Sequence, residues 1–388
     1  MKVLQIVPAI PPRGGSPSVI IKGLAGALTR AGIQATVFTT NADGDSRLDV
    51  PLGQPVECEG AQLIYYNVRP KGNYAFSPDL ALALWRQVSA FDLVHIHWLY
   101  NFAPLAGALL THMRGVPYIV QPHGSLDPVM LRRNRRWVKK VYLRSMGRLQ
   151  FNRASAVIFT SEQERKLAAH ADISAPTFVV PIGLDLAEYS KLPESGEFRS
   201  QYPQLKDKRL VLFLSRLAWQ KGLDLLVKSF RIVASRNPDA HLLIVGPDSE
   251  GYGNQVKRWV AEEGLDSRIT FVGPLYGRMK LAVFVDSEVF VLASYMENFG
   301  AVVTEALACR KPVVISNRVN IADEIAASEA GVVVDCSADS VADGINQVLD
   351  NPDLAKRLGE NGYELVRRKF TWDAALQQLV PIYRDLAG

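Results

Sequence analysis

Residues 289–308 read VFVLASYMENFGAVVTEALA and form the most informative stretch of the chain. The apolar run Val289–Ala293 is typical of a buried strand, and the stretch from Gly300 to Ala308 has few helix breakers. The pattern predicts a strand, then a loop that contains Glu297, then a helix that carries Glu305 about two turns in. Strand–loop–helix units of this kind build parallel sheets that are covered on both faces.

The same alternation runs through the whole chain. Helical patterns such as Val19–Ala31 and Leu223–Ala234 separate short apolar runs that read as strands. Thirteen such strands are too many for one ordinary doubly wound sheet, so we expect two Rossmann-like domains with a boundary within the polar stretch Pro181–Lys208. The predicted strands are Val3–Val7, Ala35–Thr39, Gln62–Tyr66, Leu93–His97, Tyr118–Gln121, Ala156–Thr160, Thr177–Val180, Leu210–Leu214, His241–Val245, Ile269–Val272, Val289–Leu292, Pro312–Ile315 and Gly331–Val334.

Composition agrees with an α/β protein of this size. A chain of 388 residues can form two cores, and its 48% hydrophobic and 21% charged residues are typical of soluble globular proteins. No apolar run approaches the roughly 20 residues that span a bilayer. Cys58, Cys309 and Cys336 show neither metal-ligand nor disulfide spacing, so we expect a reduced, cytoplasmic protein.

Glu297 and Glu305 flank a predicted helix N-terminus. Free backbone N–H groups there, at Phe299, Gly300 and Ala301, favour a phosphate group because the helix dipole and unpaired donors both attract an anion. Carboxylates accept hydrogen bonds from sugar hydroxyls. The junction, with Asn298 in the same loop, therefore has the features of a nucleotide-sugar site. The alternative is two ordinary glutamates, one that caps the helix and one that is solvated on it, because these would give the same sequence pattern.

Other polar residues follow predicted strands, where ligands bind in doubly wound sheets. Arg216 and Lys221 follow the run Leu210–Leu214 and could clamp a diphosphate, the first as a planar fork and the second as a point charge. Gly246 follows the run that ends at Val245; its missing side chain either lets a ligand approach the backbone or permits a tight turn.

The first predicted domain has matching features. Gly14 and Gly15 precede the helix that begins near Val19 and could form a backbone anion site, although glycine pairs also mark ordinary turns. His123 follows a strand between a proline and a glycine, which favours a functional histidine over a loop histidine bonded to backbone. His95 and His97 share one face of a strand, and we interpret them as core or cleft-lining residues because no third metal ligand is evident.

Taken together, these motifs resemble those of a GT-B fold, family 4 glycosyltransferase, a retaining enzyme of the kind found in cell-surface polysaccharide assembly. The resemblance covers nearly the whole length. It rests on the E-x7-E element of Glu297 and Glu305, the R-L-x-x-x-K-G element from Arg216 to Gly222, and the Pro122-His123-Gly124 turn. It implies two tandem Rossmann-like domains with doubly wound parallel sheets and a cleft between them: an acceptor-side domain over 1–185, a nucleotide-sugar domain over 186–371, and a final helix at 372–388 that packs back on the first domain.

The resemblance also implies roles for individual residues. Glu297 and the backbone after it would hold the donor sugar, Glu305 would bind the ribose, Arg216 and Lys221 would bind the diphosphate, and His123 would lie at the donor sugar and acceptor. The chain departs from the family at three places, namely Ser215 and Arg310, where the family often has glycine, and the loop 317–321, which replaces a glycine-rich loop. Because a left-handed non-glycine residue costs about 1 kcal/mol, we expect the helix end at Arg310 to be built differently.

The chemistry implied is hexosyl transfer from a UDP- or GDP-linked sugar, with retention, by front-face attack in which the leaving diphosphate takes the acceptor proton. Arg216, Lys221 and the loop amides would stabilise the developing charge, so we expect no cofactor and no metal. The only D-x-D string, Asp43-Gly44-Asp45, lies in a polar loop and is interpreted as a surface turn.

A basic segment over Leu131–Arg153 contains nine cations and no acid, so the rest of the chain is net negative. We predict a cationic amphipathic helix that attaches to an anionic membrane surface and favours a lipid-linked or polysaccharide acceptor; a solvated helix that faces acids of the same protein is the alternative. Nucleic acid is not expected, because no binding module is recognised. The patch comprises Arg132, Arg133, Arg135, Arg136, Trp137, Lys139 and Lys140.

Three other functions would share the predicted sheets. A nicotinamide dehydrogenase would need G-x-G-x-x-G after a strand with an acid some 20 residues on, and neither is present. A GT-B nucleotide-sugar epimerase and a non-catalytic sugar- or lipid-binding protein with this fold both stay open.

Overall fold

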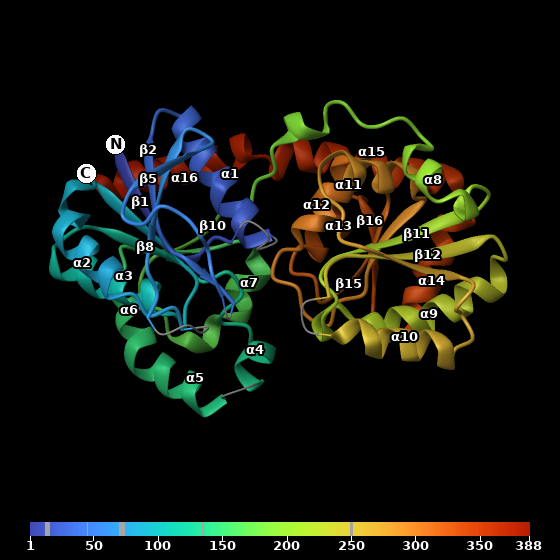
Figure 1. Ribbon diagram of the computed structural model, residues 1–388, viewed down its shortest axis with the longest axis horizontal. Coiled ribbons are helices and arrows are strands. Elements are labelled where there is room, and N and C mark those ends of the chain that lie inside the picture. Colours follow the sequence, from blue (N-terminus) through green and yellow to red (C-terminus); the bar gives the residue numbers. More distant parts are fainter. Residues whose placement is uncertain (12–15, 45, 70–73, 134–135, 249–250) are drawn as a thin grey trace. The chain divides into compact units, whose positions relative to one another are not determined.

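The computed structural model describes the chain from residue 1 to residue 388 except residues 12–15, 45, 70–73, 134–135 and 249–250 (Figure 1). It consists of two compact α/β units. The first comprises Met1–Gly183 together with Trp372–Gly388, and the second comprises Leu184–Thr371. The break at 183/184 falls at the start of the polar stretch, and the last helix is part of the first unit.

The first unit is built on an eight-stranded sheet in the order β10-β9-β8-β7-β1-β2-β6-β5. All neighbours are parallel except β5, which pairs antiparallel with β6. The strand order reverses between β1 and β7, so the sheet has a topological switch point there. The strands are β1 (Lys2–Ala9), β2 (Gln34–Thr40), β5 (Pro55–Cys58), β6 (Ala61–Tyr66), β7 (Leu93–His97), β8 (Tyr118–Gln121), β9 (Ala156–Phe159) and β10 (Thr177–Val179).

Helices cover both faces of this sheet. The last helix, α16, packs against the first, α1, and its Pro381 lies within the helix. The helices are α1 (Ser16–Arg30), α2 (Pro78–Gln87), α3 (Phe102–Met113), α4 (Pro128–Arg132), α5 (Arg136–Tyr142), α6 (Arg148–Asn152), α7 (Glu162–Leu167) and α16 (Trp372–Ala387), with a π turn, η2 (Leu143–Gly147), and short 3-10 turns η1 (Val88–Ala90) and η3 (Ala169–Ala171).

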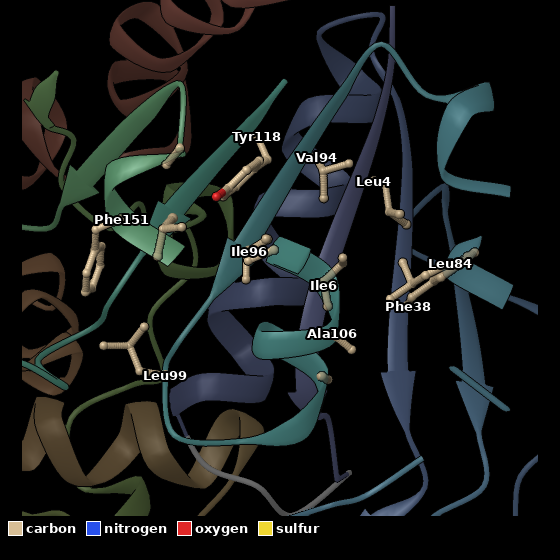
Figure 2. Packing of buried hydrophobic residues seen from close by; sticks show 14 of the residues in the cluster. Leu4, Ile6, Phe38, Leu84, Val94, Ile96, Leu99, Ala106, Tyr118 and Phe151 are labelled. Carbon is tan, nitrogen blue, oxygen red and sulfur yellow. The ribbon is translucent and has the colours of Figure 1, made fainter. Parts of the chain in front are cut away.

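The core of the first unit follows from continuous apolar strands. A parallel strand that is buried on both faces has no exposed side to make polar, so its sequence reads as an uninterrupted apolar run. Leu4 and Ile6 of β1, Phe38 of β2 and Ile96 of β7 are fully buried and pack in one cluster (Figure 2). This packing fixes the positions of the strand ends that carry the polar residues.

The second unit contains a six-stranded, fully parallel sheet in the order β13-β12-β11-β14-β15-β16. This is the strand order of dinucleotide-binding folds, with the switch point between β11 and β14. The strands are β11 (Arg209–Leu214), β12 (Ala240–Val245), β13 (Ile269–Gly273), β14 (Val289–Leu292), β15 (Val313–Ser316) and β16 (Gly331–Val334).

The helices of the second unit follow the strands as the sequence predicts. They are α8 (Glu197–Gln201), α9 (Leu223–Arg236), α10 (Tyr252–Glu262), α11 (Gly277–Asp286), α12 (Ala301–Ala308), α13 (Ala322–Ala327), α14 (Ala338–Leu349) and α15 (Pro352–Lys369), with 3-10 turns η4 (Leu186–Tyr189), η5 (Pro203–Leu205) and η6 (Trp219–Lys221). Among the helices of the described residues, none is both long and apolar enough to cross a bilayer.

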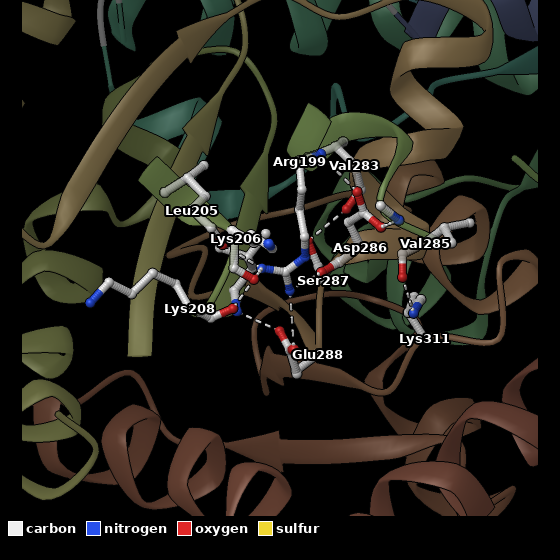
Figure 3. Close-up of polar contacts among 12 residues, drawn as sticks. Arg199, Leu205, Lys206, Lys208, Val283, Val285, Asp286, Ser287, Glu288 and Lys311 are labelled. Atoms are coloured by element: carbon white, nitrogen blue, oxygen red, sulfur yellow. Dashed lines mark hydrogen bonds and ion pairs between the residues drawn. The ribbon is translucent and has the colours of Figure 1, made fainter. Parts of the chain in front are cut away.

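A polar network centred on Arg199 fastens the start of the second unit to its sheet (Figure 3). The Arg199 guanidinium donates to the carbonyl oxygens of Leu205 at 2.6 Å, Lys208 at 2.7 Å and Asp286 at 2.9 Å. The Asp286 carboxylate, which is buried, accepts from the backbone N–H groups of Gly196 at 2.5 Å and Arg199 at 3.0 Å. Hydrogen bonds to charged groups contribute more than neutral ones, so this network secures the segment that enters β11.

All thirteen predicted strands are present, and the described residues contain three further strands that were not predicted. β5 is a short edge strand, and β3 (Ala42–Asp43) and β4 (Ser46–Arg47) form a two-residue ladder. Asp43 and Gly44 lie in this exposed hairpin, as predicted for a surface turn, while Asp45 lies outside the described residues. No group of three or more His, Cys, Asp or Glu side chains in the described part of the chain is arranged to hold a metal ion.

Two local predictions were wrong. The basic segment is not one helix: α4 ends at Arg132, and the next residue, Arg133, has an extended backbone (φ −95°, ψ 150°) before α5 begins. Arg310 was expected to change the end of α12, but it adopts the left-handed conformation itself (φ 55°). Its N–H donates to Leu307 and that of Lys311 to Ala306, as in a Schellman motif.

Arg310 is held in this conformation by contacts that a glycine could not make. Its guanidinium lies 3.8 Å from the ring centre of Tyr363 and donates to the Glu360 carboxylate at 3.1 Å. Cation–π and ion-pair contacts of this kind offset the cost of about 1 kcal/mol for a left-handed residue with a side chain.

Candidate active site

The loops after β11 and β14 meet at the switch point of the second sheet. The Lys221 ammonium, at the end of η6, forms an ion pair with Oε2 of Glu297, and the two side chains are only 12% and 16% exposed. The Tyr295 N–H donates to the Gln220 carbonyl at 2.9 Å, so backbone also joins the two loops. The structure therefore brings Lys221 and Glu297, which were predicted separately, into direct contact.

Glycine makes this approach possible. Gly222 has φ +64° and begins α9, and a β-carbon there would lie 2.0 Å from the carbonyl oxygen of Ala293. Gly246, with φ +144°, is similar: a β-carbon would lie 1.9 Å from the carbonyl oxygen of Ser215. The backbone that approaches Gly246 is thus the protein's own, from the loop that carries Arg216, and Gly246 shapes the site by letting the loops pack.

Arg216 is the exposed cation of the site. It lies between Ser215, whose N–H donates to the Val245 carbonyl at 3.0 Å, and Leu217, whose N–H donates to the Pro247 carbonyl at 3.0 Å. These two bonds fix the backbone on both sides of Arg216. Within the described residues its guanidinium makes no ion pair or hydrogen bond, so the side chain is available to an anion.

The loop after β14 ends in the N-terminus of α12. Gly300 starts the helix with φ +75°, and the Phe299 side chain is buried, 5.5 Å from the Phe370 ring. Phe299 therefore offers a ligand only its backbone. The N–H groups of Phe299, Gly300 and Ala301 donate to no acceptor in the part of the chain that the structure describes, as expected for a helix N-terminus.

The loop 317–321 supports Glu297. The Glu297 N–H donates to the Arg318 carbonyl at 3.1 Å, and the Glu297 carbonyl accepts from the Asn320 N–H at 3.0 Å. Glu297 and Val319 form an isolated parallel bridge. The segment 317–321 thus fixes the backbone of the first glutamate, while Asn298 lies next to it, half-buried.

Glu305 has a partner that the sequence did not reveal. The Lys280 ammonium of α11 donates to Oε1 of Glu305 at 3.1 Å, and the side chains are 24% and 17% exposed. The only sequence signal for Lys280 is a lysine within a helix, which is too common to select. The site therefore contains two lysine–glutamate pairs, one at each end of the E-x7-E element.

His123 belongs to the first unit, where it joins a stack of aromatic rings. His97 Nδ1 lies 2.9 Å from His123 Nε2, and the Trp98 ring stacks on His123 with centroids 4.5 Å apart. On the other side His95 stacks on His97 at 4.2 Å, and His95 Nδ1 lies 2.6 Å from the Tyr383 hydroxyl of α16. The two strand histidines share one face, as predicted, and His123 extends their stack.

Loss of solvation keeps these rings uncharged, and of the three His95 and His97 are buried while His123 is partly exposed. Loss of solvation lowers the pKa of His123 to about 3 and that of His95 to about 3, and it lowers the pKa of His97 well below the usual value. Nearby histidines reinforce the effect for His95 and His97. All three rings are therefore neutral at ordinary pH, so His123 is suited to hydrogen bonding rather than to carrying charge.

Glu164 holds the turn that carries His123, and sequence reasoning missed it. Its buried carboxylate accepts from the Gly124 N–H at 2.5 Å and from the N–H and hydroxyl of Thr160 at 2.6 and 2.7 Å. Ser161 accepts from the Glu164 N–H at 3.0 Å at the start of α7. The S-x-x-E spacing directly after β9 was a readable capping-box signal.

The basic patch is only partly as predicted. Trp137, Val138 and Val141 are exposed by 72%, 63% and 63% on α5, and Arg132, Arg133 and Lys140 are also exposed. Lys139, by contrast, donates to the carbonyl oxygens of Met130 at 2.7 Å and Arg133 at 3.2 Å, so it closes the end of α4 instead of facing an external anion. Gly14, Gly15 and Arg135 lie outside the described residues, and only the backbone of Arg136 is described.

Two family models match this chain. Residues 15–183 match the model of the glycosyl transferase 4-like domain, and residues 194–365 match that of glycosyl transferases group 1. The chain is thus composed of the two domains of a GT-B glycosyltransferase.

Among known proteins, the chain is 28% identical to a D-inositol 3-phosphate glycosyltransferase of Corynebacterium glutamicum, over 80% of this chain and 76% of the relative. Its fold matches sucrose-phosphate synthase from Thermosynechococcus elongatus with a TM-score of 0.79 and 24% identity, over 100% and 99% of the two chains. It also matches Anabaena HepE, solved in complex with UDP and glucose, with a TM-score of 0.81 and 20% identity over 100% of both chains.

Proposed function

We propose that this protein is a retaining hexosyltransferase that moves a sugar from a nucleoside-diphosphate sugar to an acceptor without a metal ion. The observation that carries the proposal is the Lys221–Glu297 pair beside the α12 N-terminus, at the switch point of the second sheet. Ligands of such sheets bind outside the carboxyl ends of the strands at this point.

Different residues of the second unit bind different parts of the donor. The amides of Phe299, Gly300 and Ala301 and the exposed Arg216 face anions, and they stabilise charge that develops on the leaving diphosphate. Glu297, supported by Lys221, accepts hydrogen bonds from hydroxyls of the sugar. Glu305, positioned by Lys280, binds the ribose.

Front-face attack fits this set of groups. The cations and amides neutralise the diphosphate, which takes the acceptor proton as the bond to the sugar breaks. Glu297 is bonded to Lys221 and is assigned to binding rather than to a covalent step. A structural neighbour supports the donor class, because it was solved with UDP and glucose.

The exposed face of α5 favours an acceptor on a membrane. Trp137, Val138 and Val141 form an apolar surface beside exposed cations, including Lys140, whose ammonium lies 5.5 Å from the Trp137 ring centre. Aromatic and aliphatic side chains insert at a bilayer interface, while lysine and arginine attract anionic lipids at about 1 kcal/mol each. We therefore propose a peripheral, cytoplasmic-face protein whose acceptor is a lipid-linked or polysaccharide intermediate.

Donor binding and product analysis test the transfer proposal. The temperature of thermal unfolding should rise with one series among the UDP-, GDP- and ADP-sugars, because a ligand that binds only the folded state stabilises it. The selected donor should then be hydrolysed slowly or transferred to added lipid extract. Formation of an epimeric sugar without acceptor would indicate an epimerase, and binding without any turnover would indicate a binding protein; either result would refute the transferase assignment.

Vesicle sedimentation tests the membrane proposal. Binding to anionic vesicles should be clear at low salt and weaken as salt rises, because screening shortens the range of charge attraction. Charge reversal at Arg132, Arg133 and Lys140 should abolish it, whereas reversal of the exposed α15 cations Lys356 and Arg368 should not. If the unaltered protein ignores anionic vesicles at low salt, the acceptor is soluble.

A further inference from the structure

His97 and His123 share a hydrogen bond that constrains the protons of both rings. His97 Nδ1 and His123 Nε2 are 2.9 Å apart, and neither ring carries a charge at ordinary pH because burial lowers both pKa values. One proton lies between the two nitrogens, so exactly one of the two rings donates. Which ring donates decides which nitrogen of His123 is left with a proton.

The buried nitrogen of His97 decides the direction. Nε2 of His97 is buried and has no hydrogen-bond partner among the described residues. A proton there would leave a buried N–H donor unsatisfied, and buried N–H groups without acceptors are rare in native proteins. A proton on Nδ1 is used in the hydrogen bond to His123 and leaves only a lone pair at Nε2. His97 is therefore the donor, and His123 Nε2 is the acceptor.

Resting on the proposed transferase function, we infer that His97 is a positioning residue that locks His123 as the Nδ1–H tautomer. His123 then presents a neutral N–H donor to an oxygen atom of the substrate and has no free lone pair with which to act as a base. A hydroxyl of the transferred sugar, or of the acceptor, is the chemical group that such a donor binds.

The surroundings of His123 are built to keep the ring in this orientation. Trp98 covers one face of the ring, with the ring planes inclined by 26°. The turn itself is held by a hydrogen bond from the Gly124 N–H to the Glu164 carboxylate. His123 has a left-handed backbone (φ 48°), which a residue with a side chain adopts at some cost. The His123 side chain is partly exposed, and no described residue hydrogen-bonds to its Nδ1.

Nitrogen NMR reads the tautomer directly in the unaltered protein. In protein with ¹⁵N-labelled histidine, long-range ¹H–¹⁵N spectra distinguish a neutral Nδ1–H ring from a neutral Nε2–H ring, and a His123→Asn variant assigns the signal among the six histidines of the chain. We expect the Nδ1–H pattern for His123 at pH 7.5, without any ligand. An Nε2–H ring at His123 would overturn the inference.

A matched pair of variants tests the role of His97. In His97→Asn the amide can still donate to His123 Nε2, whereas in His97→Leu it cannot, and both side chains fit a buried strand position. We expect the Asn variant to keep the Nδ1–H pattern and most of the activity. The Leu variant should shift His123 toward the Nε2–H form that free histidine prefers and lower kcat/KM roughly tenfold or more.

The outcomes separate this inference from the proposed function. Equal loss of activity in the Asn and Leu variants, with an unchanged His123 tautomer, would overturn the positioning role. A protein that transfers no sugar but shows the Nδ1–H ring, lost only in the Leu variant, would refute the proposed function and support the tautomer assignment. Circular dichroism and thermal unfolding of each variant check that a lost signal is not lost folding.

Discussion

Lys221 and Glu297 form an ion pair across 76 residues of sequence, and both side chains are largely buried. Each belongs to a separate motif, one after β11 and one after β14, and the adjacent positions of these strands in the sheet bring the two together. A cation that is paired with the Glu297 carboxylate cannot be a freely solvated charge. Lys221 is therefore expected to orient Glu297 as well as to attract the diphosphate.

The two cations of the β11 loop should be essential for turnover. We expect Arg216→Ala and Lys221→Ala each to lower kcat roughly 10²-fold or more, because each substitution removes a preorganised positive charge that would stabilise the leaving diphosphate. Lys228→Ala, an exposed lysine on the neighbouring α9, is the matched control and should keep its rate. Steady-state rates with the selected donor decide the question, and near-normal rates in both loop variants would remove the clamp.

The two glutamates should affect different parts of the donor. Glu305→Ala and Lys280→Ala should both weaken binding of the free nucleoside diphosphate, since Lys280 holds Glu305 at 3.1 Å. Glu297→Ala should leave that affinity nearly normal and weaken only the intact nucleotide sugar. Calorimetric titration with both ligands measures the difference. Equal losses of diphosphate affinity in the Glu297 and Glu305 variants would contradict the division of roles.

Gly222 and Gly246 should tolerate no side chain. Gly222→Ala and Gly246→Ala place a methyl group about where a backbone oxygen already lies, and we expect each to lower the free energy of unfolding of the second unit by about 3 kcal/mol or more. Gly264→Ala is the control: Gly264 has a similar φ of +66°, but a β-carbon there would meet no atom of the described residues within 4 Å, so only the backbone cost of about 1 kcal/mol applies. Denaturant unfolding compares them, and equal effects would show that strain alone matters.

Acid should destabilise the first unit at a pH where most proteins are still stable. His95, His97 and His123 have pKa values far below the unfolded value of 6.5, so the unfolded state binds more protons between about pH 6 and pH 3. The free energy of unfolding must then fall as pH drops through 6.5, by up to about 1.4 kcal/mol per pH unit for each ring. Thermal unfolding between pH 7.5 and 5 measures this slope.

Variants identify the rings responsible for the acid slope. His97→Leu removes one of the buried rings and should make the dependence less steep. A melting temperature that is independent of pH over this range would show that the buried rings already carry protons in the folded state.

Activity should not depend on a divalent metal. Arg216, Lys221 and the helix amides are expected to supply the positive charge that a metal provides in other transferases. Initial rates in excess EDTA should therefore equal those with added Mg²⁺ or Mn²⁺. If EDTA lowers the rate and either ion restores it, the reaction depends on a metal, and Asp43 and Asp45 become the candidate ligands.

Local pattern was sufficient for much of the fold. All thirteen strands predicted from apolar runs are present, because a parallel strand covered on both faces must be apolar on both faces. The helix α12 begins one residue after the predicted start at Gly300. The missed strands β3, β4 and β5 are only two to four residues long and, apart from the buried Ala42 of β3, are half-buried or exposed, so they lack the apolar run that marks a buried strand. The prediction of a single helix in the basic segment was wrong, because a charge pattern does not show where a helix ends. The helix α4 ends before Arg133, whose backbone is extended.

The sequence by itself determined which residues stand at strand ends, and therefore that Arg216, Lys221, Glu297 and His123 are candidates for a site. Only the tertiary structure decided their partners: Lys221 with Glu297, Lys280 with Glu305, and His97 with His123. Periodicity reports the contacts a residue makes within its own helix or strand. Pairing across loops depends on strand order and on close backbone approach, as at Gly222, and these arise only when the whole sheet is packed.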